Sequence, residues 1–554
     1  MNKTFQFIVM AFLVVIASSC GNEQAKDETK YTPPPASTEF DVVILNGRVM
    51  DPETNFDGVR NVGILDGRIA LITEDEISGK ETIDATDQVV APGFIDTHFH
   101  WQRLLGYKIG IRDGLTSNMD LELGCAGNKI DQYYADRAGK SPANYGTGSS
   151  HEFARAAVLD GTDPYSDIDA FRTRSEAQGW ALTKPTLEQG NQILQIMDEG
   201  LQQGAVGIAS TLGYMREGIS SREVYEAQKV AARYGRAYQA HTRYTPDNDV
   251  GEANGAQELI ANAMALDAPV VVSHFNNPGW RLVHELLTRL REQGHNVWGE
   301  IYPYAAGSTT LNAVFLQPEN WVDRLGHTYE NTLQDVETGE FYTRETYAKA
   351  VKETPTKEIL LWKMPPEDAV EWLKLKGTTM ASDAMAPMNV LTSPWDTPWE
   401  EFGNMHPRSA GARAMTLRLA REHAIPMMQV ISILSYNAAK YLGDTGLKAM
   451  QERGRMQEGM VADIVVFDPM TVTENSTFEN GSIPSTGFKS VIVNGVQVVK
   501  EDKAIEVFPG QPIRYEPVDK PRFEPVSQEA WEAVYNVSIE IPGGECIPVP
   551  WEEE

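Results

Sequence analysis

The chain has 554 residues, 42% of them hydrophobic, and a formal net charge of −30. That length exceeds one ordinary compact domain and suits a large domain accompanied by a smaller one. So negative a chain is a poor partner for nucleic acids and anionic membrane surfaces, and we expect it to bind neither. The three cysteines, Cys20, Cys125 and Cys546, are too few for a disulfide framework.

The first twenty residues have the features of an export signal. Lys3 is followed by an apolar run from about Phe7 to Ala17, and then by Ser18-Ser19-Cys20. Small residues before a cysteine that ends an apolar run resemble a bacterial lipobox, which predicts lipidation of Cys20. We therefore expect 1–20 to be a lipoprotein signal peptide and 21–38 a flexible tether. The anchor would be the only membrane contact of an exported protein facing the periplasm or exterior; an ordinary signal peptide or an uncleaved anchor is the alternative.

Short strands with tight-turn residues follow the tether and return near the other end of the chain. Asn46-Gly47 and Asp66-Gly67 each stand between two apolar runs, a pattern typical of β-hairpins. The same texture at both ends predicts a small β-sandwich domain formed from both, with the middle of the chain inserted as a second domain. The predicted limits are 39–92 for the first part of the sandwich, 93–452 for the inserted domain, 453–515 for the second part and 516–554 for a C-terminal tail of unassigned role.

Strand-like and helix-like segments alternate through the middle of the chain. This alternation is typical of an α/β fold in which helices connect parallel strands. Eight strands with crossover helices close most simply as a (β/α)8 TIM-like barrel. A charged, tyrosine-rich insertion at 320–360 precedes the last strand. The predicted strands are 94–100, 115–122, 145–150, 205–210, 237–243, 269–274, 297–303 and 378–383.

Side chains that bind metals stand at the ends of several of these strands. His98 and His100 end the first strand, where residues two apart face the same side. His241, His274 and Asp383 end the fifth, sixth and eighth strands, and active sites of such barrels lie at these ends. A lone histidine is more often structural, but four of the chain's ten histidines fall at strand ends. The set predicts a site for one or two zinc ions.

At this point the chain resembles a known family. Ala91-Pro92-Gly93-Phe94-Ile95-Asp96-Thr97-His98-Phe99-His100 resembles the opening motif of the amidohydrolase superfamily, as does the β unit split between the chain ends. More narrowly, the chain resembles the N-acyl-D-amino-acid deacylase (D-aminoacylase) branch over roughly 40–510. The stretches that carry this resemblance are 199–207 with Tyr214, His241-Thr242-Arg243, Tyr302 to Thr309, His406-Pro407-Arg408, and Gly459 to Pro469.

The resemblance implies a metal pair that shares a bridging ligand. Many superfamily members supply it as a carboxylated lysine on strand four, but 205–210 contains no lysine. Members of the deacylase branch, which this chain resembles, instead have a cysteine or a glutamate after strand two, and this chain has both. Strand alternation favours Glu122 as the ligand, and Cys125 would be a good thiolate ligand for zinc. The alternative role of Glu122 is that of a buried salt-bridge partner, and the alternative role of Cys125 is that of a small buried apolar residue.

The expected activity is zinc-dependent cleavage of the amide bond of N-acyl-D-amino acids. Asp383 is the expected general base that takes the proton of the attacking water and delivers it to the departing amine. The expected substrate contacts are Arg243 and Arg408 for a carboxylate, with Tyr214 and Ser308 by resemblance and His151 as a weaker candidate. Some deacylases carry a lysine where this chain has Asn276, which leaves open how the α-carboxylate is bound.

Three other functions remain open at this point. The first two are a hydrolase of cyclic amides, such as a hydantoinase or dihydroorotase, and an isoaspartyl-dipeptidase-like peptidase. The missing strand-four lysine counts against the first, and less decisively against the second. The third is a surface lipoprotein that binds amino-acid derivatives without turnover, which would have no need of a general base.

Overall fold

The computed structural model describes residues 31–166, 169, 174, 178–243, 254–323, 325–385, 387, 390 and 392–532. The predicted signal peptide, Cys20 and Cys546 lie outside these residues, as does most of the predicted tether. Within the described residues, no helix is both long and apolar enough to cross a bilayer.

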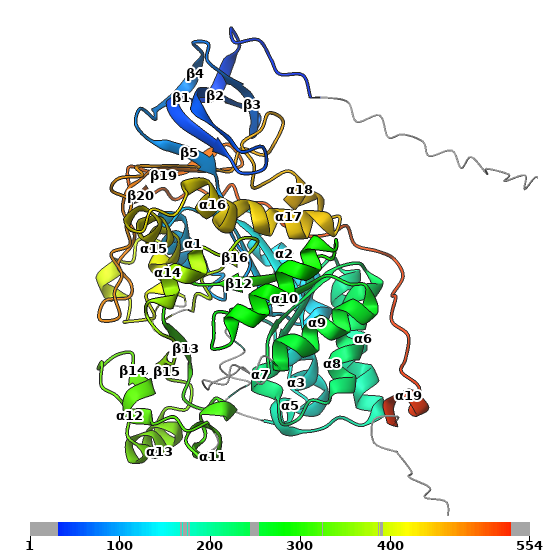
Figure 1. The fold of residues 1–554 in the computed structure, drawn as a ribbon. Helices are drawn as coiled ribbons and strands as arrows, with labels where there is room; N and C mark the ends of the chain where they lie inside the picture. Colours follow the sequence, from blue (N-terminus) through cyan, green and yellow to red (C-terminus); the bar gives the residue numbers. More distant parts are fainter. Residues whose placement is uncertain are drawn as a thin grey trace, which may run out of the picture.

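Eight parallel strands form the centre of the molecule, in the spatial order β16-β12-β11-β10-β9-β8-β7-β6. This confirms the predicted barrel (Figure 1). Backbone hydrogen bonds beyond the first and last strands close the ring: the Asp383 N–H donates to the His98 carbonyl at 2.8 Å, and the His100 N–H donates to Ala384 at 3.0 Å. The strands are β6 (Phe94–Asp96), β7 (Leu115–Cys125), β8 (Asn144–Ser150), β9 (Gly207–Thr211), β10 (Ala237–His241), β11 (Val270–Val272), β12 (Val297–Ile301) and β16 (Thr379–Met380).

Several strands end earlier than predicted, just before the side chains expected to bind metal. β6 ends two residues before His98, β11 two before His274 and β16 three before Asp383. His274 and Asp383 have φ angles of 28° and 53°, in the left-handed region that non-glycine residues seldom adopt. The backbone therefore leaves the regular ladder where these side chains turn toward the barrel mouth.

Amphipathic helices surround the strands. The best predicted of them, α6, begins after a capping box in which Thr186 and Gln189 bond each other's backbone, and it buries Ile193, Met197 and Leu201. The helices of the barrel region are α1 (Leu104–Arg112), α2 (Ile130–Arg137), α3 (His151–Leu159), α5 (Gly179–Leu182), α6 (Leu187–Gln202), α7 (Leu212–Met215), α8 (Ser221–Arg233), α9 (Asn254–Leu266), α10 (Trp280–Glu292), α14 (Asp368–Leu373), α15 (Arg408–Glu422), α16 (Met427–Ile431), α17 (Asn437–Asp444) and α18 (Lys448–Gln451).

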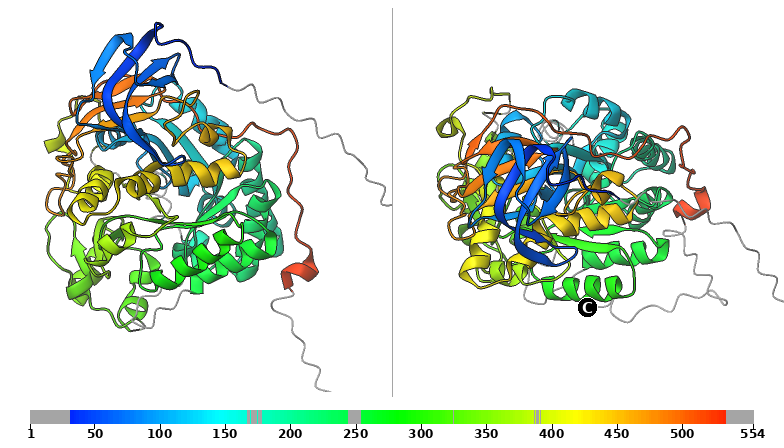
Figure 2. Two further views of the ribbon diagram at one scale, coloured as in Figure 1. Left: turned by 45° about the horizontal axis from the view of Figure 1, so that its top comes forward. Right: turned by 90° about the horizontal axis from the view of Figure 1, so that it is seen from above.

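The second domain is a nine-stranded sheet built from both chain ends, as predicted (Figures 1 and 2). β5 and β17 join the two halves by antiparallel pairing, with Pro92 opposite Ile464. The strands are β1 (Glu39–Asp51), β2 (Phe56–Leu65), β3 (Arg68–Thr73), β4 (Ser78–Asp84), β5 (Val89–Pro92), β17 (Ile464–Phe467), β18 (Phe488–Val493), β19 (Val496–Lys500) and β20 (Lys503–Ala504).

One predicted turn in this domain is wrong. Asp66-Gly67 forms the β2–β3 hairpin as expected, but Asn46-Gly47 lies inside the continuous strand β1 as an irregularity of register. β1 pairs with β4 before this point and with β5 after it. A side chain at position 47 would collide with Val90 of β5. The glycine therefore permits the close approach of a new partner strand, rather than a reversal of the chain.

The insertion before the last barrel strand is larger than predicted and forms a unit with its own core. It contains a small sheet of order β13-β15-β14, at the lower left in Figure 1, and short helices. The buried side chains of its core include Leu311, Trp321 and Tyr347. Its elements are β13 (Ala306–Thr310), η2 (Val314–Leu316), α11 (Pro318–Trp321), α12 (Tyr329–Thr332), β14 (Leu333–Asp335), α13 (Arg344–Glu353) and β15 (Glu358–Trp362).

The described part of the C-terminal tail runs along the outside of the barrel (Figure 2). Just before the tail, the Ile513 N–H donates to the Tyr145 carbonyl at 2.7 Å and the Tyr515 N–H donates to Gly204 at 3.0 Å. Within the tail, the Val518 N–H donates to the Gln202 carbonyl at 2.9 Å. The segment ends in α19 (Gln528–Glu532), where Trp531 is 9% exposed. A Cβ at Gly190 of α6 would collide with the Trp531 indole. The tail is therefore fastened to the barrel at both ends of this segment.

Candidate metal centre

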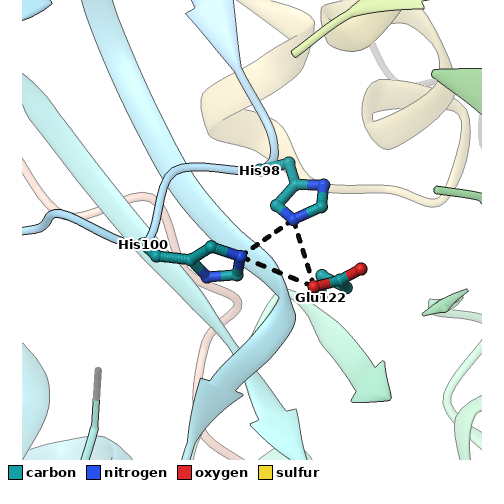
Figure 3. A group of neighbouring side chains, drawn as sticks. All are labelled: His98, His100 and Glu122. Atoms are coloured by element: carbon teal, nitrogen blue, oxygen red, sulfur yellow. Dashed lines mark hydrogen bonds and ion pairs between the residues drawn. The ribbon is translucent and has the colours of Figure 1, made fainter. Parts of the chain in front are cut away.

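The two histidines after β6 and the glutamate of β7 meet at the barrel mouth (Figure 3). The Nε2 atoms of His98 and His100 are 2.9 Å apart. Glu122 Oε2 lies 3.2 Å from His98 Nε2 and 3.5 Å from His100 Nε2. Three donor atoms thus converge on one small volume, in the range of distances that a single ion would span.

A second group of donors forms around the other oxygen of the same carboxylate. Glu122 Oε1 lies 3.1 Å from His241 Nδ1 and 3.0 Å from His274 Nε2. Glu122 is therefore shared by two groups of three possible ligands, one with His98 and His100 and one with His241 and His274. This is the arrangement of a carboxylate that bridges two metal ions.

Asp383 completes the first group from the far end of the sheet. Its Oδ1 lies 3.3 Å from His98 Nε2 and 3.4 Å from His100 Nε2, while its Oδ2 lies 2.9 Å from a guanidinium nitrogen of Arg408. The side chain reaches this place from the strained backbone described above, where φ is 53°. A strained residue among ligands is a common mark of a functional site.

The electrostatics of the centre favour a bound cation. Burial lowers the pKa of His98, but the carboxylates of Glu122, Asp383 and Glu300 raise it well above its ordinary value. Burial raises the pKa of Asp383, yet Arg408 and His98 bring it below its usual range, so the carboxylate stays ionised. Four imidazoles and two carboxylates are the nitrogen and oxygen ligands that zinc prefers, and the donor set fits one or two such ions.

The structure does not bring Cys125 to this centre. Its buried thiol is 3.9 Å from the carbonyl of Lys129, and its backbone pairs with Ser149 of β8. Cys125 is three residues after Glu122, and an odd separation along a strand turns two side chains to opposite faces. Gly124, with φ of 78°, adds a local irregularity between them. Of the two alternatives for the bridging position, only Glu122 lies between the histidines.

Arg243 also lies away from the predicted role. Its guanidinium makes a two-pronged pair with Glu258 and donates to the Ile219 carbonyl and the Ser221 hydroxyl, each at 2.8 Å. β10 ends at His241, so strand alternation no longer dictates the direction of a side chain two residues further on. The arginine holds α8 and α9 against the barrel rather than facing the metal ligands.

His151 is likewise engaged in the protein interior. It begins α3, is fully buried, and lies 3.1 Å from both the Ser210 hydroxyl and the Glu223 carboxylate. Burial lowers the pKa of His151 below its ordinary value and outweighs the opposite effect of Glu223. Glu223 also pairs with Arg155. These contacts are those of a neutral histidine inside a packed polar cluster.

Two of the other predicted substrate residues border the metal centre. The ring of Tyr214 lies 5.0 Å from that of His241, and its hydroxyl is 2.8 Å from Thr309 of the insertion. Arg408 contacts Asp383 as described, and its guanidinium stacks 5.0 Å above the Tyr302 ring. By contrast, the hydroxyl of Ser308 is occupied by a 2.5 Å hydrogen bond to Glu358 on the neighbouring strand of the insertion.

Three further residues at the centre were not predicted. Glu300 contacts Nδ1 of His98, and Asp120 lies 2.9 Å from Nδ1 of His100. Phe315 of the insertion stacks beside His241, with ring centroids 6.4 Å apart. A sequence signal existed for the two acids, since each is a charged residue inside a predicted barrel strand. None existed for Phe315, which lies in the three-residue helix η2.

Comparison with known proteins finds relatives that span most of the chain. No family model matches the chain. It is 25% identical over 513 residues to a D-aminoacylase and 25% identical over 490 residues to an N-acyl-D-glutamate deacylase, both of Alcaligenes xylosoxydans xylosoxydans; the matches cover 86% and 83% of this chain, and 97% and 94% of the relatives. A dihydroorotase of Solibacter usitatus is 55% identical, but over only 60 residues, which are 11% of this chain and 14% of that protein.

Solved structures of a D-aminoacylase and of an N-acyl-D-glutamate deacylase share the fold. The N-acyl-D-glutamate deacylase of Bordetella bronchiseptica, in complex with zinc and a phosphonate inhibitor, has a TM-score of 0.69 at 22% identity, over 86% of this chain and all of that one. A D-aminoacylase with a binuclear metal centre has a TM-score of 0.68 at 22% identity with the same coverage. The chain is therefore a homologue of the D-aminoacylases and N-acyl-D-glutamate deacylases and has the fold of these amidohydrolases.

Proposed function

We propose that the protein is a zinc-dependent hydrolase that cleaves the amide bond of N-acyl-D-amino acids or related D-amino-acid derivatives. The observation that carries this proposal is Glu122, whose two oxygens each face a separate pair of imidazoles at a barrel mouth. Homologues that span most of the chain are deacylases of such compounds.

His98, His100, Glu122, His241, His274 and Asp383 would hold one or two zinc ions. Bound zinc would supply a water of lowered pKa and would polarise the carbonyl of the scissile amide. Glu122, buried and shared between both groups, orients the four imidazoles toward a common volume. The positive φ at His274 and Asp383 fixes the direction of these two side chains before substrate arrives.

Asp383 would act as the general base. Its carboxylate is ionised and lies beside the nitrogens that would hold the metal, so it can take the proton of the attacking water. When the C–N bond breaks, the same carboxyl group returns that proton to the departing amine. The products are then a carboxylic acid and a free amino acid, and Asp383 is regenerated as the carboxylate.

Arg408 would bind the carboxylate of the substrate. It is 1% exposed, and although it is ion-paired with Asp383, none of its guanidinium nitrogens has a hydrogen-bond partner among the described residues. A buried guanidinium with unused donors is suited to a bidentate carboxylate contact. The backbone N–H of Arg408 donates to Nδ1 of His406 at 3.0 Å, which fixes its position at the start of α15. Tyr214 would contact the substrate from the side of His241.

The alternatives are cyclic-amide hydrolysis, isoaspartyl-type dipeptidase activity and binding without turnover. The missing strand-four lysine disfavours the first two, and an ionised Asp383 among a complete ligand set is unnecessary for the third. The test uses protein from residue 21 onward, supplied with zinc, and measures amine release from N-acetyl-D- and N-acetyl-L-amino acids, hydantoins and β-aspartyl dipeptides. Release from the D series alone supports the proposal. Turnover of hydantoins or dipeptides only, or zinc binding with no turnover, would replace it by the matching alternative.

We also propose that the protein is exported and lipid-anchored through Cys20. The support is the sequence alone: an apolar run that ends in small residues and a cysteine. Expression of the full chain and of Cys20→Ala, followed by membrane fractionation and labelling with a palmitate analogue, tests it. Label and membrane association lost in the variant support the anchor. Equal fractionation of the two proteins without label would contradict it.

A further inference from the structure

We propose that Glu300 and Asp120 are positioning residues that orient the imidazoles of His98 and His100 toward the metal. Neither acid belongs to the set expected to hold the ion. The proposal rests on the metal centre of the proposed function, and it concerns how that centre is prepared rather than which substrate it takes.

The two histidines after β6 are held in the same way, each through its Nδ1. Glu300 Oε1 accepts from His98 Nδ1, and Asp120 Oδ2 lies 2.9 Å from His100 Nδ1. An imidazole whose Nδ1–H donates to a carboxylate keeps the lone pair of its Nε2 free for a metal. In both rings it is Nε2 that faces Glu122. The same tautomer is thus imposed on both rings by two separate acids.

Glu300 is itself rigidly held. It belongs to β12, is 1% exposed, and its second oxygen accepts from the Gln239 amide at 2.9 Å and from the Thr97 hydroxyl at 3.3 Å. Gln239 is equally buried, on β10. Because the donors come from different parts of the barrel, the carboxylate cannot rotate away from His98 without breaking these bonds. A buried acid with this set of partners acts as a fixed acceptor.

Asp120 connects His100 to the bridging carboxylate. Its other oxygen accepts the backbone N–H groups of Leu123 and Gly124, at 3.0 and 3.1 Å. These two amides follow Glu122 directly, so the contact fixes the chain at the end of β7 where the bridge is displayed. One carboxylate therefore sets both the ring of His100 and the turn beside Glu122. His241, in the other half of the centre, faces Glu122 through Nδ1 instead.

Removal of either carboxylate charge should therefore weaken zinc binding without unfolding the protein. Partners of this kind typically contribute 10- to 100-fold to metal affinity. Glu300→Gln keeps the size of the side chain but removes the anion that favours the Nδ1–H tautomer. We expect zinc affinity to fall by about 10- to 100-fold in this variant, and by a similar factor in Asp120→Asn.

The experiment measures the zinc dissociation constant of the metal-free full-length protein by competition with a chromophoric chelator. Glu223→Gln is the matched control, since Glu223 is also a fully buried carboxylate that contacts an imidazole, that of His151. Thermal unfolding of each metal-free variant reports its fold. We expect the control to lower the unfolding temperature while leaving zinc affinity within about threefold, as a residue outside the centre should. Co²⁺-loaded Glu300→Gln should also show an altered visible absorption spectrum.

Zinc affinity unchanged within threefold in folded Glu300→Gln and folded Asp120→Asn would overturn the proposal. So would a loss of affinity as large in Glu223→Gln. If Glu300→Gln fails to fold, Asp120→Asn decides the matter, because it acts on the other ring. No substrate enters these measurements, so their outcome is separate from the proposed amide hydrolysis, which is decided by amine release from N-acetyl-D-amino acids by the zinc-loaded protein.

Discussion

Replacement of Asp383 by asparagine tests the central step of the proposed reaction. The change keeps the shape of the side chain but removes its charge and its ability to accept a proton. A general base contributes roughly 10²- to 10⁴-fold to turnover, which corresponds to about 3–5 kcal/mol of barrier. Because Arg408 and Tyr214 still line the site, we expect kcat to fall by this factor and KM to change only a few-fold.

Asp383→Asn also leaves the Arg408 guanidinium, 1% exposed, without its partner 2.9 Å away. Loss of one member of a buried pair costs about 3–5 kcal/mol of stability, so the assay belongs well below the unfolding temperature. Amine release is followed by steady-state kinetics, together with zinc content. A variant that binds zinc normally and retains more than about a tenth of kcat would refute the role of Asp383 as general base. If zinc content falls together with kcat, the main role of Asp383 is that of a metal ligand.

Three other perturbations probe the site and its surroundings. Cys125→Ala should leave zinc affinity unchanged, because the thiol points away from the centre. Glu122→Ala should lower it by more than about 100-fold, because both groups of ligands lose a member. Titration with a chelator measures both affinities, and a larger loss in Cys125→Ala than in Glu122→Ala would make the thiol the ligand. Burial and Arg408 lower the pKa of His406 well below its ordinary value. Below about pH 6.5 the folded state then carries fewer protons than the unfolded state. The free energy of unfolding therefore decreases as the pH is lowered through this range, by up to about 1.4 kcal/mol per pH unit. Urea titrations should show a shallower fall in His406→Gln, and equal slopes would contradict the assignment. Trp531→Ala should lower stability by about 2–4 kcal/mol without changing kcat, as thermal unfolding and the amine assay would show; reduced turnover in folded protein would imply that the tail reaches the site.

The barrel and its ligand set are predictable from sequence because both depend on local patterns. The alternation of strand-like and helix-like segments identifies the eight strands, and polar residues near the ends of several of these strands identify the mouth. The same reasoning fails where a strand stops. Arg243 follows β10 by two residues, so the alternation that was to turn it toward the metal no longer applies, and it pairs with Glu258 instead.

Other differences arise from contacts between distant parts of the chain. Asn46-Gly47 has the composition of a hairpin turn, yet its role depends on Val90 of a different strand. Glu300 is recognisable only as an acid in a buried strand, and its contact with His98 joins residues about 200 positions apart. Ser308 resembles a substrate contact, but the insertion supplies Glu358 as its partner. Local propensity carries no information on such pairings.

The ring of parallel strands is completed at the same place where its metal ligands meet. Between β6 and β16 the ladder is replaced by a few amide contacts of His98, His100 and Asp383. An ion held by these three residues would cross-link the first and last strands of the sheet. Binding of the metal and closure of the barrel would then be thermodynamically coupled. Ligand binding to the folded state alone stabilises it in proportion to the logarithm of concentration. Zinc supply would then set how often this edge of the barrel opens, and the His100 and Asp383 amides would exchange with solvent fastest in metal-free protein.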